Sequence, residues 1–329
     1  MKLSDIPIAT VCLIKEFIKP SSEKILVYGD IMLDRYIECG INPSQAEGVP
    51  IYKVNETLSF PGGAANVASN LSLLGNQVIL FGAIGKDLEG EILLNLLKHT
   101  MDIKYILHNQ TGKTTVKYRV MLEEEQAFRI DREVAIETGC IQKKKFLNWA
   151  GELLSEVKCL VLSDYLKGFL DDESTMFLIE IARMNGIPIV ADPKGTDIEK
   201  YRGVTVLTPN LNEFNLLTNN KYQSIFDAIE AAKNLRKDLN IDALVLKGDS
   251  EGSMLIHDDV IHHKAIKANG DVFVIGAGDS MVATLASAIC KGMKISDAFI
   301  LSNISASLAV SNPYTYSLSK KDFIHILEN

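Results

Sequence analysis

Residues 274–286, VIGAGDSMVATLA, place two glycines and an alanine directly before a carboxylate at the start of an apolar run. Gly276, Ala277 and Gly278 lack bulky side chains, so their backbone N–H groups can approach a ligand closely. Unpaired N–H groups and the positive end of a helix dipole favour an anion such as phosphate. Asp279 at this point suits a general base that accepts a hydroxyl proton beside a transferring phosphoryl group. A glycine-rich turn with an aspartate N-cap has the same pattern, and this alternative stays open.

The run after the glycines predicts a helix from about residue 279 to 289, followed by Lys291 and Gly292 as stop signals. The GAGD motif matches neither the dinucleotide fingerprint GxGxxG nor the P-loop GxxxxGK[ST]. The sequence therefore disfavours a dinucleotide-binding dehydrogenase and a Walker-type NTPase.

Short apolar runs rich in β-branched residues alternate with helical patterns along the chain. Continuous apolarity over so few residues is typical of strands buried on both faces, as in a parallel sheet covered by helices. The predicted strands are 25–30, 78–85, 159–164, 187–192, 204–210 and 243–248, and the helical patterns between them include 65–75, 90–99, 175–186 and 225–239. This order predicts an α/β, doubly wound architecture with a mostly parallel sheet, spanning 1–329 as one domain.

Each predicted strand ends in a polar residue or a glycine. These residues are Asp30, Gly85, Asp164, Asp192, Asn210 and Lys247. Open parallel sheets bind ligands beyond the carboxyl ends of their strands. Turn formation explains any one of these side chains, but five polar side chains out of six at one edge favour an active site there.

Two segments near 35–56 and 112–132 differ from the rest in their strict period-two alternation. Such alternation predicts a sheet with one covered and one solvated face. We interpret the two segments as a small antiparallel β lid inserted into the main domain. Lys117, Arg119 and Arg129 share the polar face of this lid and are candidates to bind an anionic substrate. A merely solvated outer face fits the pattern equally well.

Composition limits the classes of protein and of partner. Hydrophobic residues make up 47% and charged residues 23%, as in ordinary globular proteins, and the net charge of −8 disfavours a nucleic-acid partner. The first 20 residues predict an amphipathic helix that ends near Pro20 rather than a signal peptide, and no run is long enough to span a membrane. Five dispersed cysteines without a CxxC pair indicate ordinary thiols and a cytoplasmic location.

Two signatures at opposite ends of the chain carry a resemblance to a known family. GAGD at 276–279 and PGGAANVASNLSLLG at 61–75 resemble the two signatures of the ribokinase-like (PfkB) carbohydrate kinases. Within this family, GDIMLDRY at 29–36, LSDYLKG at 162–168 and the segment 192–214 are most similar to the D-glycero-β-D-manno-heptose-7-phosphate kinases. The resemblance covers nearly the whole chain.

The resemblance implies a role for each matching position. Asp279 becomes the catalytic base, and Gly276, Ala277 and Gly278 become the anion hole. The family positions that hold sugar hydroxyls are matched by Asp30, Asp34, Gly62, Gly63 and Asn66. The lid residues Lys117, Arg119 and Arg129 become candidates for the phosphate already on the sugar. Without the family, a tight turn is the alternative explanation for the paired glycines.

ATP as co-substrate and Mg²⁺ as cofactor are also implied. Asn210 and Glu213 match the family's NxxE motif, which orders Mg²⁺ and its waters, although the same spacing is also a helix-start signature. Lys194 in the DPKG segment is a candidate cation near the nucleotide phosphates, although a surface lysine is its ordinary role. The expected nucleotide edge comprises Lys247, Gly248, Gly252 and, on a later helix, Asn303.

Two departures from the family pattern bear on cation use and substrate. The family usually has an aspartate shortly before the first glycine of GAGD, where this chain has Phe273, Val274 and Ile275, so activation by a monovalent cation is doubtful. Heptose-phosphate kinases have an RISPEAPVP-like run, where this chain has NPSQAEGVP at 42–50. Asn42 and Ala46 therefore bear on which sugar is bound.

The leading hypothesis is a kinase that transfers phosphate from ATP to the anomeric hydroxyl of a heptose 7-phosphate. A PfkB-family kinase for another sugar, such as fructose or ribose, is the nearest alternative. A sugar- or nucleotide-binding module without turnover comes from a different class of protein. The edges and apolar face of a small lid need cover, so we expect a homodimer formed through the lid.

Overall fold

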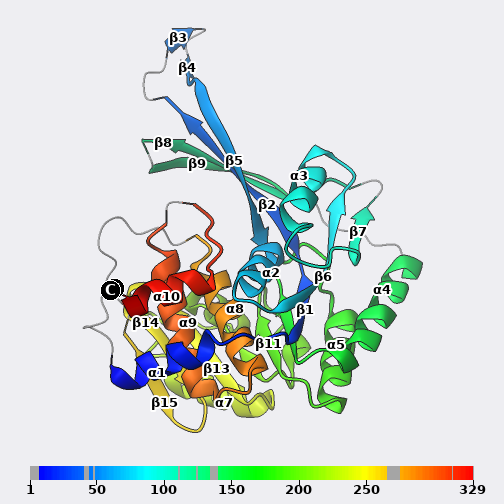
Figure 1. Ribbon diagram of the computed structural model, residues 1–329, viewed down its shortest axis with the longest axis vertical. Coiled ribbons are helices and arrows are strands. Elements are labelled where there is room, and N and C mark those ends of the chain that lie inside the picture. Colours follow the sequence, from blue (N-terminus) through cyan, green and yellow to red (C-terminus); the bar gives the residue numbers. More distant parts are fainter. Residues whose placement is uncertain are drawn as a thin grey trace.

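The computed structural model describes residues 7–40, 44–46, 49–109, 112–123, 125–133, 140–264, 275–312 and 314–328. A layered α/β body carries a β arm that stands above it, and Figure 1 shows the arm rising from one end of the body. The helices in the described part of the chain are α1 (Ile8–Phe17), α2 (Ala64–Leu73), α3 (Leu88–Leu97), α4 (Cys140–Leu153), α5 (Asp172–Met184), α6 (Leu211–Thr218), α7 (Ile229–Asp238), α8 (Ala277–Cys290), α9 (Ile295–Ala309) and α10 (Lys320–Glu328).

The body is built on a large sheet with strand order β15-β14-β13-β12-β11-β10-β1-β6-β7. Its strands are β1 (Lys24–Gly29), β6 (Gln77–Gly85), β7 (Ile106–Asn109), β10 (Cys159–Ser163), β11 (Ile189–Asp192), β12 (Val206–Leu207), β13 (Ala243–Gly248), β14 (Gly252–Ile256) and β15 (Val260–His263). Pairing is parallel from β7 to β13, and β14 and β15 add an antiparallel edge. All six predicted strands are present, although β12 is shorter than the predicted 204–210.

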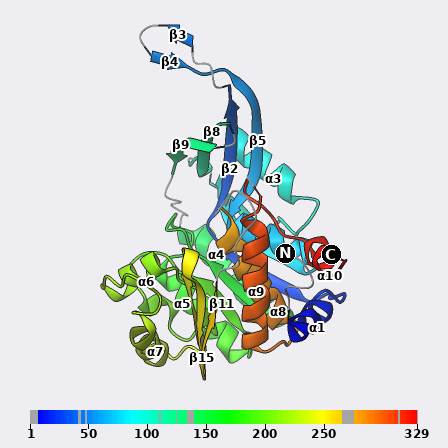
Figure 2. The ribbon, with the colours of Figure 1, turned by 90° about the vertical axis from the view of Figure 1, so that its left-hand side faces the viewer.

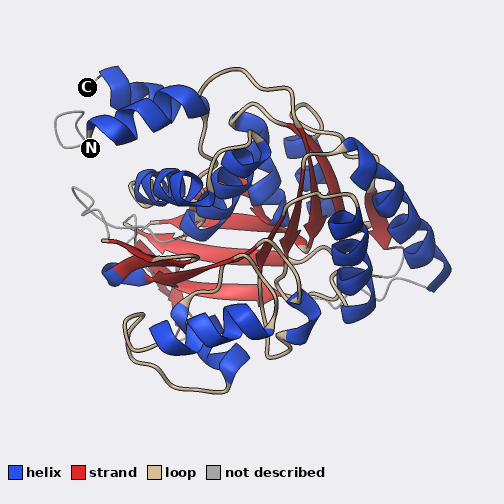
Figure 3. Cartoon of the chain, turned by 90° about the horizontal axis from the view of Figure 1, so that it is seen from below, coloured by secondary structure: helices blue, strands red, loops and turns tan. Residues whose placement is uncertain are grey.

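Both faces of this sheet are covered by helices, as Figure 3 shows from below. In β1, Ile25 and Val27 pack into a core with α1, α2, α8, α9 and α10, whereas Leu26 and Tyr28 pack into a second core with α4, α5 and α7. Each fully buried side chain of this size contributes about 1.5–3 kcal/mol relative to an exposed one. The continuous apolarity of these strands therefore has a direct cause: neither face meets water.

The strand order reverses beside β1, because β6 and β7 extend the sheet on one side and β10 begins the other. In open parallel sheets, ligands bind beyond the carboxyl ends of the strands at such a reversal. Asp30 follows β1 and Asp164 follows β10, so two of the predicted polar strand ends lie at this reversal.

The arm is the predicted lid, and it forms a separate sheet of order β5-β2-β8-β9. Its strands are β2 (Ile31–Cys39), β5 (Val54–Gly63), β8 (Val116–Leu122) and β9 (Glu125–Arg132), and a short hairpin of β3 (Ser44–Ala46) and β4 (Val49–Ile51) lies at its tip. In Figure 2 the long strands β2 and β5 run from the body up to this hairpin. The pairs β2–β5 and β8–β9 are antiparallel as predicted, but the central pair β2–β8 is parallel. Those two strands are joined by a long crossover rather than a hairpin, so they can run in the same direction.

Side chains on the lid depart from the predicted arrangement of one covered and one solvated face. On β8, Val116 and Val120 are buried, but Arg119 on the opposite face is also buried, so both faces are covered there. On β9 the apolar residues Phe128 and Ile130 are exposed, at 47% and 56%. The alternation therefore predicted which side chains share a face of the lid, but not which parts of each face are buried.

The remaining sequence expectations concern the N-terminus and the cysteines. Helix α1 ends at Phe17, before Pro20 as predicted. Cys12, Cys39, Cys159 and Cys290, whose side chains are described, are all free thiols. Among the helices that the structure describes, none is both long and apolar enough to cross a bilayer.

Candidate active site

Helix α8 begins where the sequence motif placed its glycines. Gly276 is the N-cap residue and has a φ of +79°, in the left-handed region that favours glycine. A Cβ at Gly276 would lie 3.1 Å from Nδ2 of Asn66. The helix itself starts at Ala277, so the backbone N–H groups of residues 277–279 lie in the first turn, where an α-helix offers them no partner. This helix start has the properties of an anion site.

Asp279 lies in that first turn and is only 8% exposed. Its Oδ2 accepts a hydrogen bond from Nδ2 of Asn66 at 2.7 Å, and its Oδ1 accepts one from the Tyr165 hydroxyl at 2.6 Å. Burial raises the pKa of Asp279 to about 6, although these two hydrogen bonds lower it. A carboxylate with a pKa near neutrality suits a general base.

Asn66 is held in a fixed orientation by a chain of hydrogen bonds from helix α2. Its Oδ1 accepts from Nδ2 of Asn70 at 3.1 Å and from Oγ of Ser317 at 3.0 Å. Oδ1 of Asn70 in turn accepts from Oγ of Ser280 and from the N–H of Leu318. With its oxygen occupied by donors, the Asn66 amide must direct its NH₂ group at Asp279.

Asp34, from the lid strand β2, lies in the same region and is 5% exposed. Its Oδ2 accepts from Oγ1 of Thr315 at 2.8 Å. A Cβ at Gly62 would lie 2.9 Å from Oδ2 of Asp34, and Gly63 has a φ of +57° at the N-cap of α2. The paired glycines therefore make both the predicted tight turn and the close approach to Asp34.

The three predicted lid cations have different environments. Arg119 is buried, with Nη2 3.5 Å from Oδ1 of Asp34 and Nη1 3.0 Å from Oε1 of Gln126, and its buried Nε has no partner among the described residues. Burial lowers the pKa of Lys117, against the opposing effect of Asp34 and Asp279. Arg129 pairs instead with Asp131 at 2.8 Å and its side chain is 47% exposed. Lys117 and Arg119 thus lie near the candidate carboxylates, whereas Arg129 lies opposite Arg119 on the edge strand β9.

Asp30, predicted to hold a sugar hydroxyl, has backbone partners in this structure. Its carboxylate is fully buried and accepts the backbone N–H groups of Tyr165, Lys167 and Phe169 at 2.9, 2.9 and 3.1 Å. Burial raises its pKa, and these hydrogen bonds oppose that shift. In this structure Asp30 holds the loop at 165–169, which follows β10.

Lys247 and Asp192 form an ion pair at the ends of β13 and β11, with Nζ 2.7 Å from Oδ1. Burial lowers the pKa of Lys247, but Asp192 and Glu213 outweigh burial and the net shift is upward. A Cβ at Gly278 would lie 3.8 Å from this ammonium. A permanently charged lysine therefore lies next to the start of α8, where a phosphate would gain most from it.

Asn210 and Glu213 form a complete capping box at the start of α6. Oδ1 of Asn210 accepts the N–H of Glu213, and Oε2 of Glu213 accepts the N–H of Asn210, both at 2.8 Å. Oε1 of Glu213 also accepts from Nζ of Lys194 at 2.8 Å. The capping role of Asn210 and Glu213 is compatible with the predicted role in binding Mg²⁺. Mg²⁺ is usually held by only one or two carboxylates, together with water and substrate phosphates. In the described part of the chain, no group of three or more His, Cys, Asp or Glu could hold a metal by itself.

The other residues of the expected nucleotide edge line the start of β14 and the helix behind it. Gly248 ends β13, and Gly252 begins β14 with a φ of +89°. Asn303 is buried, its Oδ1 accepts from Oγ of Ser253 at 2.6 Å, and its Nδ2 donates to the carbonyl of Phe299. The amide of Asn303 is therefore satisfied within the body of the protein.

Three residues of this region were not singled out from the sequence. Tyr165 stands in the LSDYLKG segment but gave no sign of a contact with Asp279. Thr315 and Ser317 lie near the C-terminus in a segment without a motif. Their partners are distant in sequence, so only the fold reveals them. Most positions that depart from the family pattern lie outside the described residues: Asn42, Phe273, Val274 and the side chain of Ala46. Ile275 is described and lies in the turn before Gly276.

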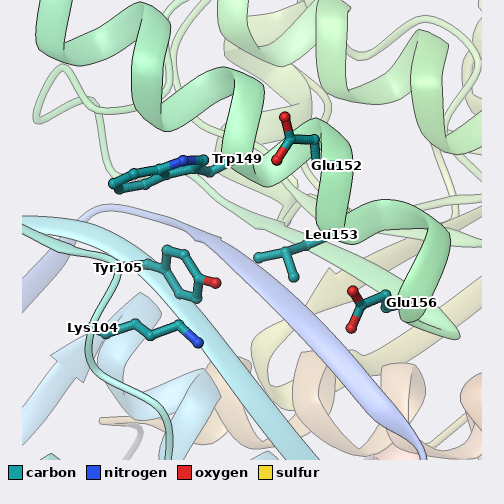
Figure 4. A pocket seen from close by; sticks show the side chains of 6 residues that line it. All are labelled: Lys104, Tyr105, Trp149, Glu152, Leu153 and Glu156. Carbon is teal, nitrogen blue, oxygen red and sulfur yellow. The ribbon is translucent and has the colours of Figure 1, made fainter.

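A cavity of about 490 Å³ lies at the opposite end of the sheet, lined by Lys104, Tyr105, Trp149, Glu152, Leu153 and Glu156 (Figure 4). Lys24 and Gln77, which begin β1 and β6, line an adjoining cavity. Two of the lysines here are paired, Lys104 with Asp102 and Lys24 with Glu156. The candidate active site is at the carboxyl ends of the same strands, so these cavities are not part of it.

Comparison with solved structures defines the class of protein. The ribokinase of Arabidopsis thaliana, solved with ribose and ATP, superposes with a TM-score of 0.74 at 19% identity, covering 94% of this chain and 100% of that one. Phosphofructokinase-2 from Escherichia coli, solved with potassium, gives 0.75 at 18% identity, covering 94% and 99%. The architecture is therefore the ribokinase-like fold.

The sequence comparison is more specific. Residues 22–322 match the pfkB family of carbohydrate kinases, and the chain belongs to this family. It is accordingly an ATP-dependent sugar kinase, a phosphotransferase with an alcohol group as acceptor.

The curated relatives include proteins named bifunctional protein HldE. That of Pseudomonas savastanoi pv. phaseolicola is 37% identical over 297 residues, and one from Pseudomonas aeruginosa is 35% identical over the same length. The match covers 90% of this chain and 61% of each relative. The chain therefore spans about three fifths of the length of these relatives.

Proposed function

We propose that this kinase phosphorylates a heptose 7-phosphate at its anomeric hydroxyl, with Mg-ATP as the phosphoryl donor. The observation that carries the proposal is the pair of basic side chains on β8: Arg119 lies 3.5 Å from Asp34, and Lys117 interacts electrostatically with both Asp34 and Asp279. A phosphate offers acceptors to both cations. The similarity of the relatives named HldE to this chain supports the same substrate class.

In the proposed reaction Asp279 accepts the proton of the acceptor hydroxyl. The oxygen that loses this proton forms a bond to the γ-phosphorus of ATP, the bond from that phosphorus to the β-phosphate oxygen breaks, and ADP leaves. The N–H groups at the start of α8 and the ammonium of Lys247 stabilise the phosphoryl group during transfer. Asp34, Asn66 and the Gly62–Gly63 turn position the sugar.

Mg²⁺ would be held beside the nucleotide phosphates by Glu213 and Asn210 through water. This indirect binding preserves the capping box, since both carboxylate oxygens of Glu213 already accept hydrogen bonds. The ion supplies charge neutralisation to the phosphates when it is bound. Lys194 stays paired with Glu213 in this arrangement.

The test is ADP release from Mg-ATP by the purified protein, with D-glycero-D-manno-heptose 7-phosphate offered beside fructose, ribose and their phosphates. The proposal predicts turnover on the heptose phosphate that exceeds every other acceptor by at least about tenfold in kcat/KM. If the enzyme prefers another sugar phosphate, the proposed mechanism stands and the proposed acceptor is wrong. Sugar binding without ADP release from any acceptor would favour the non-catalytic module.

We also propose a homodimer formed through the lid. Val54, Phe128 and Ile130 are all more than two fifths exposed on the lid sheet, and Ile51 is 45% exposed on the hairpin at its tip. Phe128 and Ile130 lie together on the edge strand β9, and exposed apolar side chains at a sheet edge mark a surface for another protein. A second copy in a symmetric pair is the commonest partner.

A further inference from the structure

Tyr165 contacts three parts of the proposed site at once. Its hydroxyl donates to Oδ1 of Asp279 at 2.6 Å. The ammonium of Lys117, from the lid, lies 5.1 Å from the centroid of its ring. A Cβ at Gly63 would lie 3.4 Å from its Cδ2. The ring therefore lies between the candidate phosphate-binding lysine, the glycine turn and the catalytic carboxylate.

The loop that carries Tyr165 is held by two buried carboxylates at neighbouring strand ends. Asp30 accepts the backbone N–H groups of Tyr165, Lys167 and Phe169, and Asp164 accepts that of Leu166 at 2.8 Å. Leu166 has a φ of +54°, a conformation unfavourable for a leucine that these contacts maintain. Two buried carboxylates thus fix the backbone of the short loop that carries Tyr165. The side chain of Tyr165 is therefore held in one position beside Asp279.

The hydrogen bonds to Asp279 leave room for an acceptor hydroxyl. An ionised carboxylate has about four lone-pair positions. One on Oδ1 is taken by Tyr165 and one on Oδ2 by Asn66. Each oxygen keeps a second position, and the two donors together prevent rotation of the carboxylate about its Cβ–Cγ bond. Donors to the charged form also favour ionisation, against the effect of burial.

We propose that Tyr165 is a positioning residue for proton transfer: its hydroxyl fixes the carboxylate of Asp279, holds it in the charged form and leaves a lone pair directed at the acceptor hydroxyl. This inference rests on the proposed role of Asp279 as general base. Tyr165 keeps its own proton throughout, because burial raises its pKa well above the usual range for tyrosine. The proton of the acceptor hydroxyl goes to Asp279, and Tyr165 neither gains nor loses one.

The variant that tests this is Tyr165→Phe, which retains the ring and removes only the hydroxyl. Tyr316→Phe is the matched control, because the Tyr316 hydroxyl also donates to an aspartate, Asp322, at 2.6 Å. We expect Tyr165→Phe to lower kcat by roughly tenfold to a hundredfold, as for a lost hydrogen bond to a charged group, and to leave KM for ATP within about twofold. Tyr316→Phe is expected to change neither parameter.

The pH profile separates positioning from a purely structural role. With one donor to its charged form removed, Asp279 should ionise at higher pH, so the acid limb of kcat/KM in Tyr165→Phe should move upward by about half a pH unit or more. An unmoved acid limb would overturn the inference, and so would an equal shift in Tyr316→Phe.

A second measurement does not depend on turnover. We would measure the free energy of unfolding by urea denaturation between pH 4 and pH 8. The stabilisation that comes from protonated Asp279 is lost as pH rises, and this loss should occur at higher pH in Tyr165→Phe than in the unmodified chain. In an Asp279→Asn background the Tyr165→Phe substitution should leave the pH dependence unchanged. If the unmodified protein proves inactive on every acceptor, the proposed function fails, and the denaturation curves still decide whether Tyr165 keeps Asp279 charged. Superposable curves for Tyr165→Phe and the unmodified chain would refute the inference in either case.

Discussion

Nδ2 of Asn66 donates to Oδ2 of Asp279 at 2.7 Å, across 213 residues of sequence. This hydrogen bond joins the start of the first signature helix, α2, to the start of the second, α8. Asn66 is fully buried, and its own oxygen is occupied by donors from Asn70 and Ser317. The two sequence signatures of this chain therefore form one hydrogen-bonded unit, in which the amide of one orients the carboxylate of the other.

Asp279→Asn should abolish most phosphoryl transfer. An amide cannot accept the acceptor proton, so we expect kcat to fall by about 10²–10⁴-fold with little change in KM for ATP. ADP release under saturating acceptor measures the effect, and circular dichroism checks the fold. Near-normal turnover in a correctly folded Asp279→Asn protein would contradict the role of Asp279 as general base.

Stability should depend on pH through the same carboxylate. The pKa of Asp279 is raised from 3.8 to about 6, so the folded state binds this proton more tightly than the unfolded chain does. The resulting stabilisation is fully present below pH 3.8 and is lost as pH rises through about 6. Relative to Asp279→Asn, the unmodified protein should lose on the order of 3 kcal/mol of unfolding free energy between pH 4 and pH 7. Urea denaturation of both proteins across that range measures it; parallel curves would show that Asp279 has an ordinary pKa.

Much of this arrangement could be predicted from the sequence, because local patterns report local environments. The strand ends Asp30, Asp192 and Lys247 were predicted to share one edge, since uninterrupted apolar strands require a covered parallel sheet. The glycines at 62–63 and 276–278 were predicted because a close approach of backbone needs residues without large side chains.

The contacts of individual side chains could not be predicted in the same way. Thr315 and Asp34 are hydrogen-bonded across 281 residues, and Tyr165 and Asp279 across 114, distances at which no periodicity connects them. Asp30 was expected to hold a sugar hydroxyl, but its three hydrogen bonds to the loop at 165–169 could not be predicted, because no sequence pattern connects the two segments. Alternation in β2 and β8 likewise predicts faces but not strand direction.

Removing the guanidinium of Arg119 should weaken binding of a phosphorylated acceptor specifically. We expect Arg119→Met to raise KM for the sugar phosphate by roughly tenfold to a hundredfold, because a buried charge-assisted contact is lost. KM for ATP should change little. Arg129→Met is the matched comparison, since Arg129 is exposed and already paired with Asp131, and its effect should stay within about threefold. Equal effects of the two substitutions on the sugar phosphate would exclude a phosphate subsite at Arg119.

Lys247 should contribute both to nucleotide binding and to stability. Lys247→Met leaves Asp192 buried without its partner, so unfolding free energy should fall by about 3–5 kcal/mol and KM for ATP should rise by about tenfold or more. The double variant Asp192→Asn/Lys247→Met removes both charges and should recover most of the stability, but not the affinity for ATP. Recovery of both would mean that Lys247 acts only through the fold.

The exposed apolar residues of the lid should hold two copies together. Phe128 and Ile130 pair across the strands with Val120 and Tyr118 and are 47% and 56% exposed in the single chain. Sedimentation equilibrium of the unmodified protein should give twice the chain mass of 36.3 kDa. Phe128→Asp places a charge in the proposed interface, and we expect dimer affinity to fall by at least about thirtyfold, as for loss of an interface aromatic.

Met184→Asp is the control for this substitution, because Met184 is 80% exposed at the end of α5 on the body. It should leave the mass unchanged, whereas Phe128→Asp should shift it toward the monomer at micromolar concentration. A monomeric unmodified protein, or a dimer indifferent to Phe128→Asp, would place the interface elsewhere. Since Lys117 and Arg119 lie on β8, which pairs with β9, dissociation should also raise KM for the sugar phosphate more than KM for ATP.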